Sequence, residues 1–248
     1  MNQTDPSPSS RVPQVYREFA AFLRRPVLPA ERLPQTRAWW RDVALLVALD
    51  FAVSLVLIVP LSYLSKRLGI AEPDFGMITQ YGFAVTLLAG AFAIPALEEF
   101  LFRFWLDGRP RSWLAVAAPL VAVVLIAVVV VALHPPKPVQ IAVIAALIIA
   151  ALGAIAWRLR RPGTMSPWFA RHFAWFYYAS ALAFAAAHLG NYPLSSVLTA
   201  LPMVTPQLCA GLILGFARVR FGYGAGLLIH GIVNGLAFAL VFSGVGGP

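Results

Sequence analysis

The stretch VALLVALDFAVSLVLIVPLSYLS, residues 43–65, decides the fold class of this chain. Asp50 is its only charged residue, and a helix of about 20 apolar residues is what crosses the hydrocarbon core of a bilayer. Six more apolar runs follow, at residues 77–106, 113–133, 139–157, 172–190, 197–217 and 222–243. The runs are continuous, whereas the strands of a membrane β-barrel alternate apolar and polar residues. We therefore predict an all-α, multi-pass transmembrane helical bundle with about seven spans.

The composition excludes two other classes of protein. The 248 residues are 60% hydrophobic and 12% charged, against about 45–50% and about 25% in soluble domains, so neither a soluble enzyme nor a disordered chain is expected. The net charge is +9. Its basic residues lie between the apolar runs, which indicates membrane topology and no nucleic-acid partner. The single cysteine, Cys209, allows no internal disulfide.

The basic residues also predict an orientation. With the N-terminus in the cytoplasm and seven alternating spans, the far side receives Lys66, Arg67 and Lys137, and the cytoplasmic side receives the other sixteen of the 19 Lys and Arg residues. Cytoplasmic loops are the basic ones in membrane proteins. We therefore expect a multi-pass protein of the cell membrane, in a bacterium the inner membrane, with a cytoplasmic N-terminus.

Two regions are expected along the chain. Residues 1–41 form a polar and basic N-terminal segment, and residues 42–248 form the transmembrane domain. Residues 14–25 mix aromatic residues with arginines, which suits either a short amphipathic helix on an anionic membrane face or a basic linker. The run at 77–106 is long for one crossing, so it is expected to tilt or to break near Pro95.

Ionisable residues inside a membrane span are costly and are rarely without function. Residues 98–103 read EEFLFR, and on a helix Glu99 and Arg103 are spaced to form an ion pair. Glu98 lies about 100° around the axis, away from that partner. A carboxylate left in an apolar setting suits a general base. The alternative is a structural charge network at a helix end, but two adjacent glutamates with an arginine favour function.

Two further motifs lie on later spans. Residues 184–188 read FAAAH, and a lone His188 among alanines is more often a packing residue than a catalyst. Residues 230–234 read HGIVN, which places His230 and Asn234 on one helix face, where both could donate to a developing oxyanion. The alternative is polar contact between helices, worth about 0.6 kcal/mol per bond. Asp50 is expected to accept from a buried donor or to lie near a water-filled cavity.

Taken in order, these three motifs resemble the CPBP family, which contains the type II CAAX prenyl endopeptidases and the Abi proteins. The resemblance covers residues 85–243 and implies an intramembrane glutamic endopeptidase. It implies that Glu98 and His188 activate a water and that Glu99 and Arg103 support them. His230 and Asn234 would form the oxyanion hole. It implies no metal and no cofactor, and its substrate would be a membrane-bound or lipidated peptide, of which prenylated CAAX protein is only one kind.

The residues agree in outline with this chemistry. No GxSxG nucleophile motif is present and Cys209 has no evident base beside it, which leaves a water activated by Glu98. Residues 113–157 look like an inserted helical hairpin between the first two motifs. On straight helices Glu98 would lie about 12 Å from the inner border and His188 about 22 Å, so a tilted or broken helix must bring them together.

Two other functions stay open at this point. The same scaffold could be a non-catalytic immunity or partner-binding membrane protein. It could also be a transporter, with the glutamates and histidines as an ion path, although no internal repeat is evident. The sequence does not indicate an oligomeric state.

Overall fold

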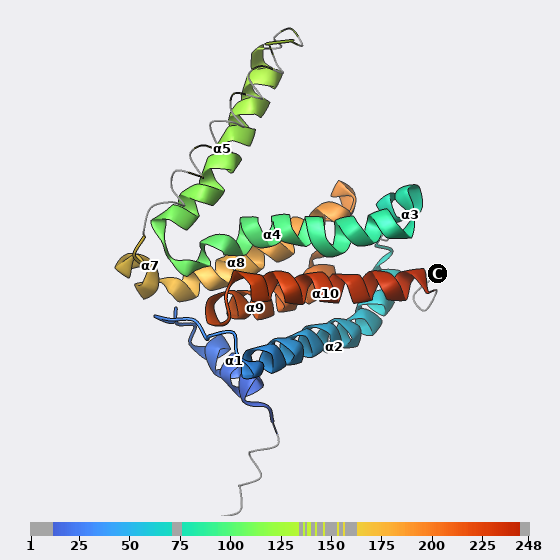
Figure 1. Cartoon of the computed structure of the whole chain (residues 1–248). Coiled ribbons are helices and arrows are strands. Elements are labelled where there is room, and N and C mark those ends of the chain that lie inside the picture. Colours follow the sequence, from blue (N-terminus) through green and yellow to red (C-terminus); the bar gives the residue numbers. More distant parts are fainter. Residues whose placement is uncertain are drawn as a thin grey trace, which may run out of the picture. The chain divides into compact units, whose positions relative to one another are not determined.

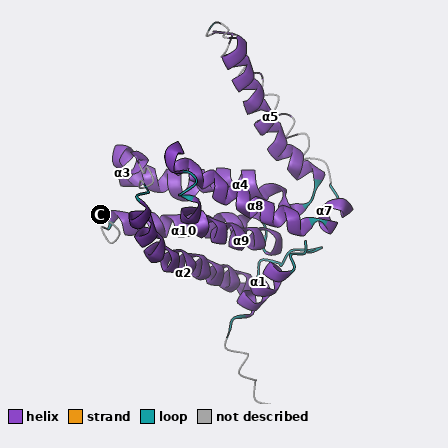
Figure 2. Cartoon of the chain, turned by 180° about the vertical axis from the view of Figure 1, so that it is seen from behind, coloured by secondary structure: helices purple, strands orange, loops and turns teal. Residues whose placement is uncertain are grey.

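The computed structural model describes residues 12–70, 76–133 and 163–243, together with residues 136, 138, 139, 142, 146, 153 and 156. In these residues every regular element is a helix, which confirms the predicted all-α class (Figure 2). The chain divides into two compact units. One consists of Met1–Arg103 with Phe173–Pro248, and the other is Phe104–His172.

The first unit is a bundle in which two C-terminal helices are central (Figure 1). Helix α9 packs on α2, α8 and α10, and α10 packs on α2, α4 and a short π-helix, η2. The 3₁₀ turn η4, His188–Asn191, follows α8 directly. The elements of this unit are α1 (Gln14–Arg24), α2 (Arg37–Leu68), α3 (Gly76–Leu88), η2 (Ala89–Ala93), α4 (Ile94–Arg103), α8 (Phe173–Ala187), α9 (Thr205–Arg220) and α10 (Tyr223–Phe242).

Four helical stretches of the described chain are long and apolar enough to cross a membrane. They are Arg37–Leu68, Gly82–Asp107, Leu201–Arg220 and Tyr223–Leu240. Each overlaps one of the seven predicted runs. The run at 172–190 contains α8, whose 15 residues rise about 22 Å, less than the roughly 30 Å of a hydrocarbon core. Most of the run at 139–157 lies outside the described residues, so the number seven stays a prediction.

The run at 77–106 is broken, as predicted, close to Pro95. Gly82 adopts a left-handed φ of 74° within α3, a conformation that glycine reaches without a steric penalty. Directly before Pro95 the chain forms the π-helix η2, in which the Ile94 N–H donates to Ala89 O. Pro95 has no N–H to donate. The Gly90 carbonyl is therefore left without its usual donor from Ile94, and it points to a partner on another helix.

An apolar core joins α2, α9 and α10. Trp39 of α2 donates its indole N–H to Phe221 O at 3.2 Å, so the ring is both buried and hydrogen-bonded. Within residues 14–25 the chain forms the helix α1, Gln14–Arg24, which decides between the two sequence alternatives in favour of a helix. Its Phe22 lies 5.2 Å from the Phe216 ring of α9. Whether α1 lies on a membrane face stays a prediction.

The second unit contains η3 (Phe104–Asp107), α5 (Pro110–Leu133) and α7 (Pro167–Arg171). The Asp107 carboxylate accepts from the Arg109 N–H at 3.0 Å and from the Ser112 hydroxyl at 2.9 Å. It thereby satisfies backbone and side-chain donors at the start of α5. The predicted run at 113–133 lies within α5.

Candidate active site

The three sequence motifs meet between α4, α8 and α10 of the first unit. Glu98 Oε1 lies 3.8 Å from His188 Nε2, and Glu98 Oε2 lies 3.4 Å from His230 Nε2. The His230 Nδ1 lies 3.0 Å from Glu99 Oε1. The structure therefore brings together both glutamates and both histidines that the sequence motifs single out.

The predicted ion pair between Glu99 and Arg103 is present. Arg103 Nη1 donates to Glu99 Oε1, and both side chains are 0% exposed. The Arg103 guanidinium lies 4.0 Å from the centroid of the Phe184 ring, so one face of the cation rests on an aromatic ring. A buried charge is tolerated only with such partners. Glu99 and Arg103 thus form a fully buried ion pair beside the more exposed residues of the cluster.

Two side chains that sequence reasoning missed hold the end of α4. Arg218 Nε of α9 donates to Arg103 O at 3.0 Å, and the Ser180 hydroxyl of α8 donates to Phe102 O at 2.6 Å. The last carbonyls of a helix have no partner within the helix. These two donors therefore fix the backbone that carries Arg103. In the sequence, Arg218 contributed only to the charge count, and no local pattern marks either residue.

The hydrogen bonds of His188 determine where its proton is. Its Nδ1 lies 2.8 Å from Phe184 O, and a carbonyl can only accept, so Nδ1 carries a hydrogen and Nε2 faces Glu98. The 3.8 Å from Nε2 to the carboxylate is too long for a direct hydrogen bond and slightly shorter than the roughly 4 to 4.5 Å between two acceptors that one water bridges. The side chains are 20% and 21% exposed, so both groups are accessible to water.

His230 lies between two carboxylates. Its Nδ1 donates to Glu99, so in the neutral imidazole the lone pair of Nε2 would face the Glu98 carboxylate. Two acceptors in contact repel, so this contact must hold one proton, on His230 or on Glu98. The oxyanion role that the resemblance implies needs a hydrogen on Nε2. That role therefore requires the cationic form of His230.

Asn234 forms a hydrogen bond to the π-helix η2, where the predicted run at 77–106 is broken. Its Nδ2 donates to Gly90 O at 3.0 Å, which is the carbonyl that η2 leaves without an intrahelical donor. One amide hydrogen of Asn234 is used in this bond, and the second has no acceptor among the described residues. A Cβ on Gly231 would lie 2.6 Å from Ala91 O, so α10 approaches η2 as closely as only glycine allows. Asn234 and Gly231 thus dock α10 on the π-helix.

Asp50 is a buried carboxylate near the same cluster. Its side chain is on α2, the residue is 1% exposed, and its Oδ1 has no hydrogen-bond partner among the described residues. It interacts electrostatically with His230 and Arg103. The sequence predicted that Asp50 accepts a hydrogen bond from a buried donor or lies near a water-filled cavity. At Oδ1, the described residues provide no such donor.

In the part of the chain that the structure describes, no group of three His, Cys, Asp or Glu side chains could hold a metal ion.

A family model matches part of the chain. Residues 80–175 match the model described as type II CAAX prenyl endopeptidase Rce1-like. This stretch of the chain is similar to an Rce1-like domain. This match supports a membrane protease of the CPBP/Abi family and confirms the resemblance drawn from the three motifs. Glu98, Glu99 and Arg103 lie inside the matched residues, and His188 and His230 follow them. No curated protein and no solved structure matches the chain.

Proposed function

We propose that this chain is an intramembrane endopeptidase that hydrolyses a membrane-bound or lipidated peptide. One observation carries the proposal. Glu98 and His188 converge to 3.8 Å and stay partly exposed, while the Glu99–Arg103 pair beside them is fully buried. A buried ion pair alone would serve stability. Two partly open groups that can share a water are what hydrolysis needs.

The reaction follows from the proton positions. A water between Glu98 and His188 donates one hydrogen to each, and Glu98 takes a proton as the water oxygen attacks the peptide carbonyl carbon. The carbonyl oxygen becomes an oxyanion, which accepts from the Nε2–H of cationic His230 and from the second amide hydrogen of Asn234. The proton on Glu98 then passes to the leaving amine nitrogen as the C–N bond breaks. Water is consumed, and the two products are a carboxylic acid and an amine.

The buried residues support the cation that this mechanism requires. Glu99 accepts from His230 Nδ1 and so stabilises the imidazolium, as a carboxylate does behind other catalytic histidines. Arg103 holds Glu99 in place from the next turn of α4. Asp50 adds a second negative charge within electrostatic range of His230. Glu99, Arg103 and Asp50 are positioning residues and do not touch the substrate.

The surroundings of the site point to the substrate class. The site lies among apolar helices, so the substrate reaches it from the membrane, as a lipidated or membrane-embedded peptide. We place the protein in the cell membrane, in a bacterium the inner membrane, with the N-terminus in the cytoplasm. A leader peptide or a membrane-bound regulator fits as well as a prenylated protein.

The test compares new peptide termini in the membrane proteome of host cells. The cells carry the wild type, Glu98→Gln, or Glu31→Gln, an exposed glutamate outside the cluster that serves as the matched control. We expect the same termini with the wild type and Glu31→Gln, and none of them with Glu98→Gln, because glutamine keeps the shape and cannot accept the proton.

Termini that persist in Glu98→Gln would overturn the role of Glu98. If folded and well-expressed wild type gives no new termini at all, the non-catalytic immunity or partner-binding function becomes the better explanation of the same scaffold.

A further inference from the structure

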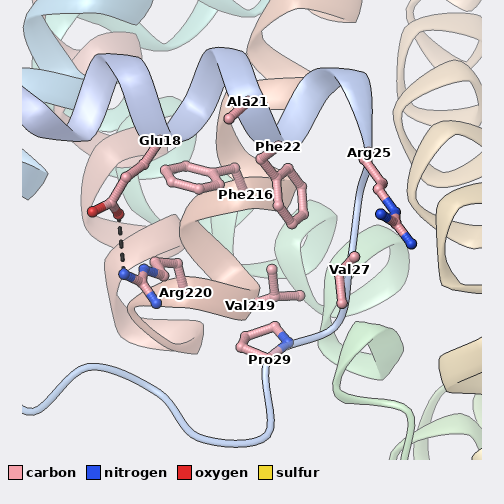
Figure 3. Close-up of a pocket in the computed structure, with 9 residues that line it drawn as sticks. All are labelled: Glu18, Ala21, Phe22, Arg25, Val27, Pro29, Phe216, Val219 and Arg220. Atoms are coloured by element: carbon pink, nitrogen blue, oxygen red, sulfur yellow. Dashed lines mark hydrogen bonds and ion pairs between the residues drawn. The ribbon is translucent and has the colours of Figure 1, made fainter.

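A pocket of about 400 Å³ lies between α1 and the end of α9 (Figure 3). None of its lining residues belongs to the Glu98 cluster. Its floor is apolar, formed in part by Phe22 of α1 and by Phe216 and Val219 of α9. The volume lies in the range of ligand sites, roughly 300–1,000 Å³.

The rim of the pocket is basic. Arg220 Nη2 is paired with Glu18 Oε2 at 3.1 Å, at one end of the pocket in Figure 3. Arg25 lies at the other end, is exposed, and its side chain makes no hydrogen bond or ion pair with the described residues. The side chain of Val27, between these ends, is apolar yet 56% exposed. The rim therefore presents one uncompensated cation beside an apolar surface.

The pocket lies where a membrane span ends. Arg220 is the last residue of α9 and of the span candidate Leu201–Arg220, so the rim falls at the level of the lipid headgroups. By the distribution of basic residues this is the cytoplasmic face, where anionic lipids give the membrane its negative surface potential. Arg24 and Arg25 add positive charge there.

We propose that this pocket binds one anionic phospholipid. The lipid phosphate pairs with Arg25, and the glycerol and first methylenes lie on Phe22, Val27 and Val219. Arginine suits phosphate because its planar fork donates two parallel hydrogen bonds. A phosphatidylcholine carries a quaternary ammonium that Arg25 would repel, whereas a phosphatidylglycerol does not. The bound lipid would hold α1 against the membrane face.

The experiment uses the purified full-length protein and measures retained lipid by native mass spectrometry and the thermal unfolding midpoint. Dioleoyl phosphatidylglycerol, dioleoyl phosphatidylcholine and inorganic phosphate are the probes. We expect the wild type to retain one phosphatidylglycerol and to gain thermal stability from it alone. Arg25→Gln should bind it about five- to tenfold more weakly.

Two variants make the test specific to the pocket. Arg24→Gln removes the same charge one residue earlier on α1, outside the pocket lining, and should bind like the wild type. Ala21→Phe fills the pocket without changing the charge and should lose the lipid. Equal losses in Arg24→Gln and Arg25→Gln, equal retention of phosphatidylcholine, full retention by Ala21→Phe, or stabilisation by inorganic phosphate alone would each overturn the proposal.

Discussion

Gly226 offers the most direct single test of the buried Glu99–Arg103 pair in the site. A Cβ at this position of α10 would lie 2.8 Å from Glu99 Oε2. Ordinary contacts of a Cβ begin near 3.4 Å, so in Gly226→Ala the carboxylate must retreat by about 0.6 Å or α10 must move. This movement would lengthen or misalign the 3.0 Å bond from His230 Nδ1 to the other oxygen, Glu99 Oε1, and so weaken it.

The expected cost can be compared within one helix. Losing a charge-assisted bond between two helices costs about 1–2 kcal/mol. Gly235→Ala is the matched control, because its Cβ would meet Ala91 Cβ at an ordinary 3.6 Å. Replacing glycine by alanine in a helix stabilises by about 0.5–1 kcal/mol in both variants, so this gain cancels in the difference. Gly226→Ala should therefore unfold about 2–6 °C below Gly235→Ala.

Thermal unfolding of the two purified variants is followed through the fluorescence of the seven tryptophans. The yield of Glu98-dependent peptide termini should fall about five- to thirtyfold in Gly226→Ala and should not change in Gly235→Ala. Equal unfolding temperatures would refute the close contact with Glu99. A destabilised Gly226→Ala with unchanged termini would refute the claim that Glu99 acts on catalysis through His230.

Two other substitutions test the contacts of the same cluster. Arg103→Gln leaves the Glu99 carboxylate buried without its cation and should lower the free energy of unfolding by about 3–5 kcal/mol; adding Glu99→Gln should recover part of the loss in a double-mutant cycle, and additive losses would contradict the pair. Asn234→Asp places an acceptor against Gly90 O and should cost about 1–3 kcal/mol, measured by thermal unfolding, while an unchanged unfolding temperature would contradict the bond to η2.

Contacts within one helix could be predicted from the sequence. Glu99 and Arg103 are four residues apart, and helical spacing alone brings their side chains together. The partners of Glu98 could not be derived in this way, because His188 and His230 lie on two other helices. The ordered motifs and the family resemblance singled out these residues. Their spacing in the sequence could not predict the distances between their side chains.

The donors at the end of α4 show what sequence patterns omit. Arg218 and Ser180 bond to backbone carbonyls, and every residue has a carbonyl, so no side-chain motif marks such an acceptor. Asp50 could be recognised from the sequence as an acidic residue within an apolar run. Its closeness to His230 depends on how α2 packs on α10, which hydropathy does not encode.

Hydropathy also treated two irregular runs as continuous. The run at 77–106 reads as one apolar span, yet α3 is kinked at Gly82 and the π-helix η2 separates α3 from α4. The run at 172–190 contains α8, which ends at Ala187 and is followed by the 3₁₀ turn that begins with His188. Apolar side chains continue through both breaks, while the backbone hydrogen bonds change. A hydropathy profile records the apolar side chains and not the backbone hydrogen bonds.

The break near Pro95 also helps to position His230 of α10 in the site. Because Pro95 donates no hydrogen bond, η2 leaves the Gly90 carbonyl to a donor from outside, and Asn234 supplies it. That bond sets the register of α10 against α4, one turn from His230. His230 then lies within 3.4 Å of both Glu98 and Glu99. Pro95 thus lacks a backbone donor, and in an apolar environment no water replaces it. This missing donor links the irregular helix to the position of His230, whose proton the proposed mechanism uses.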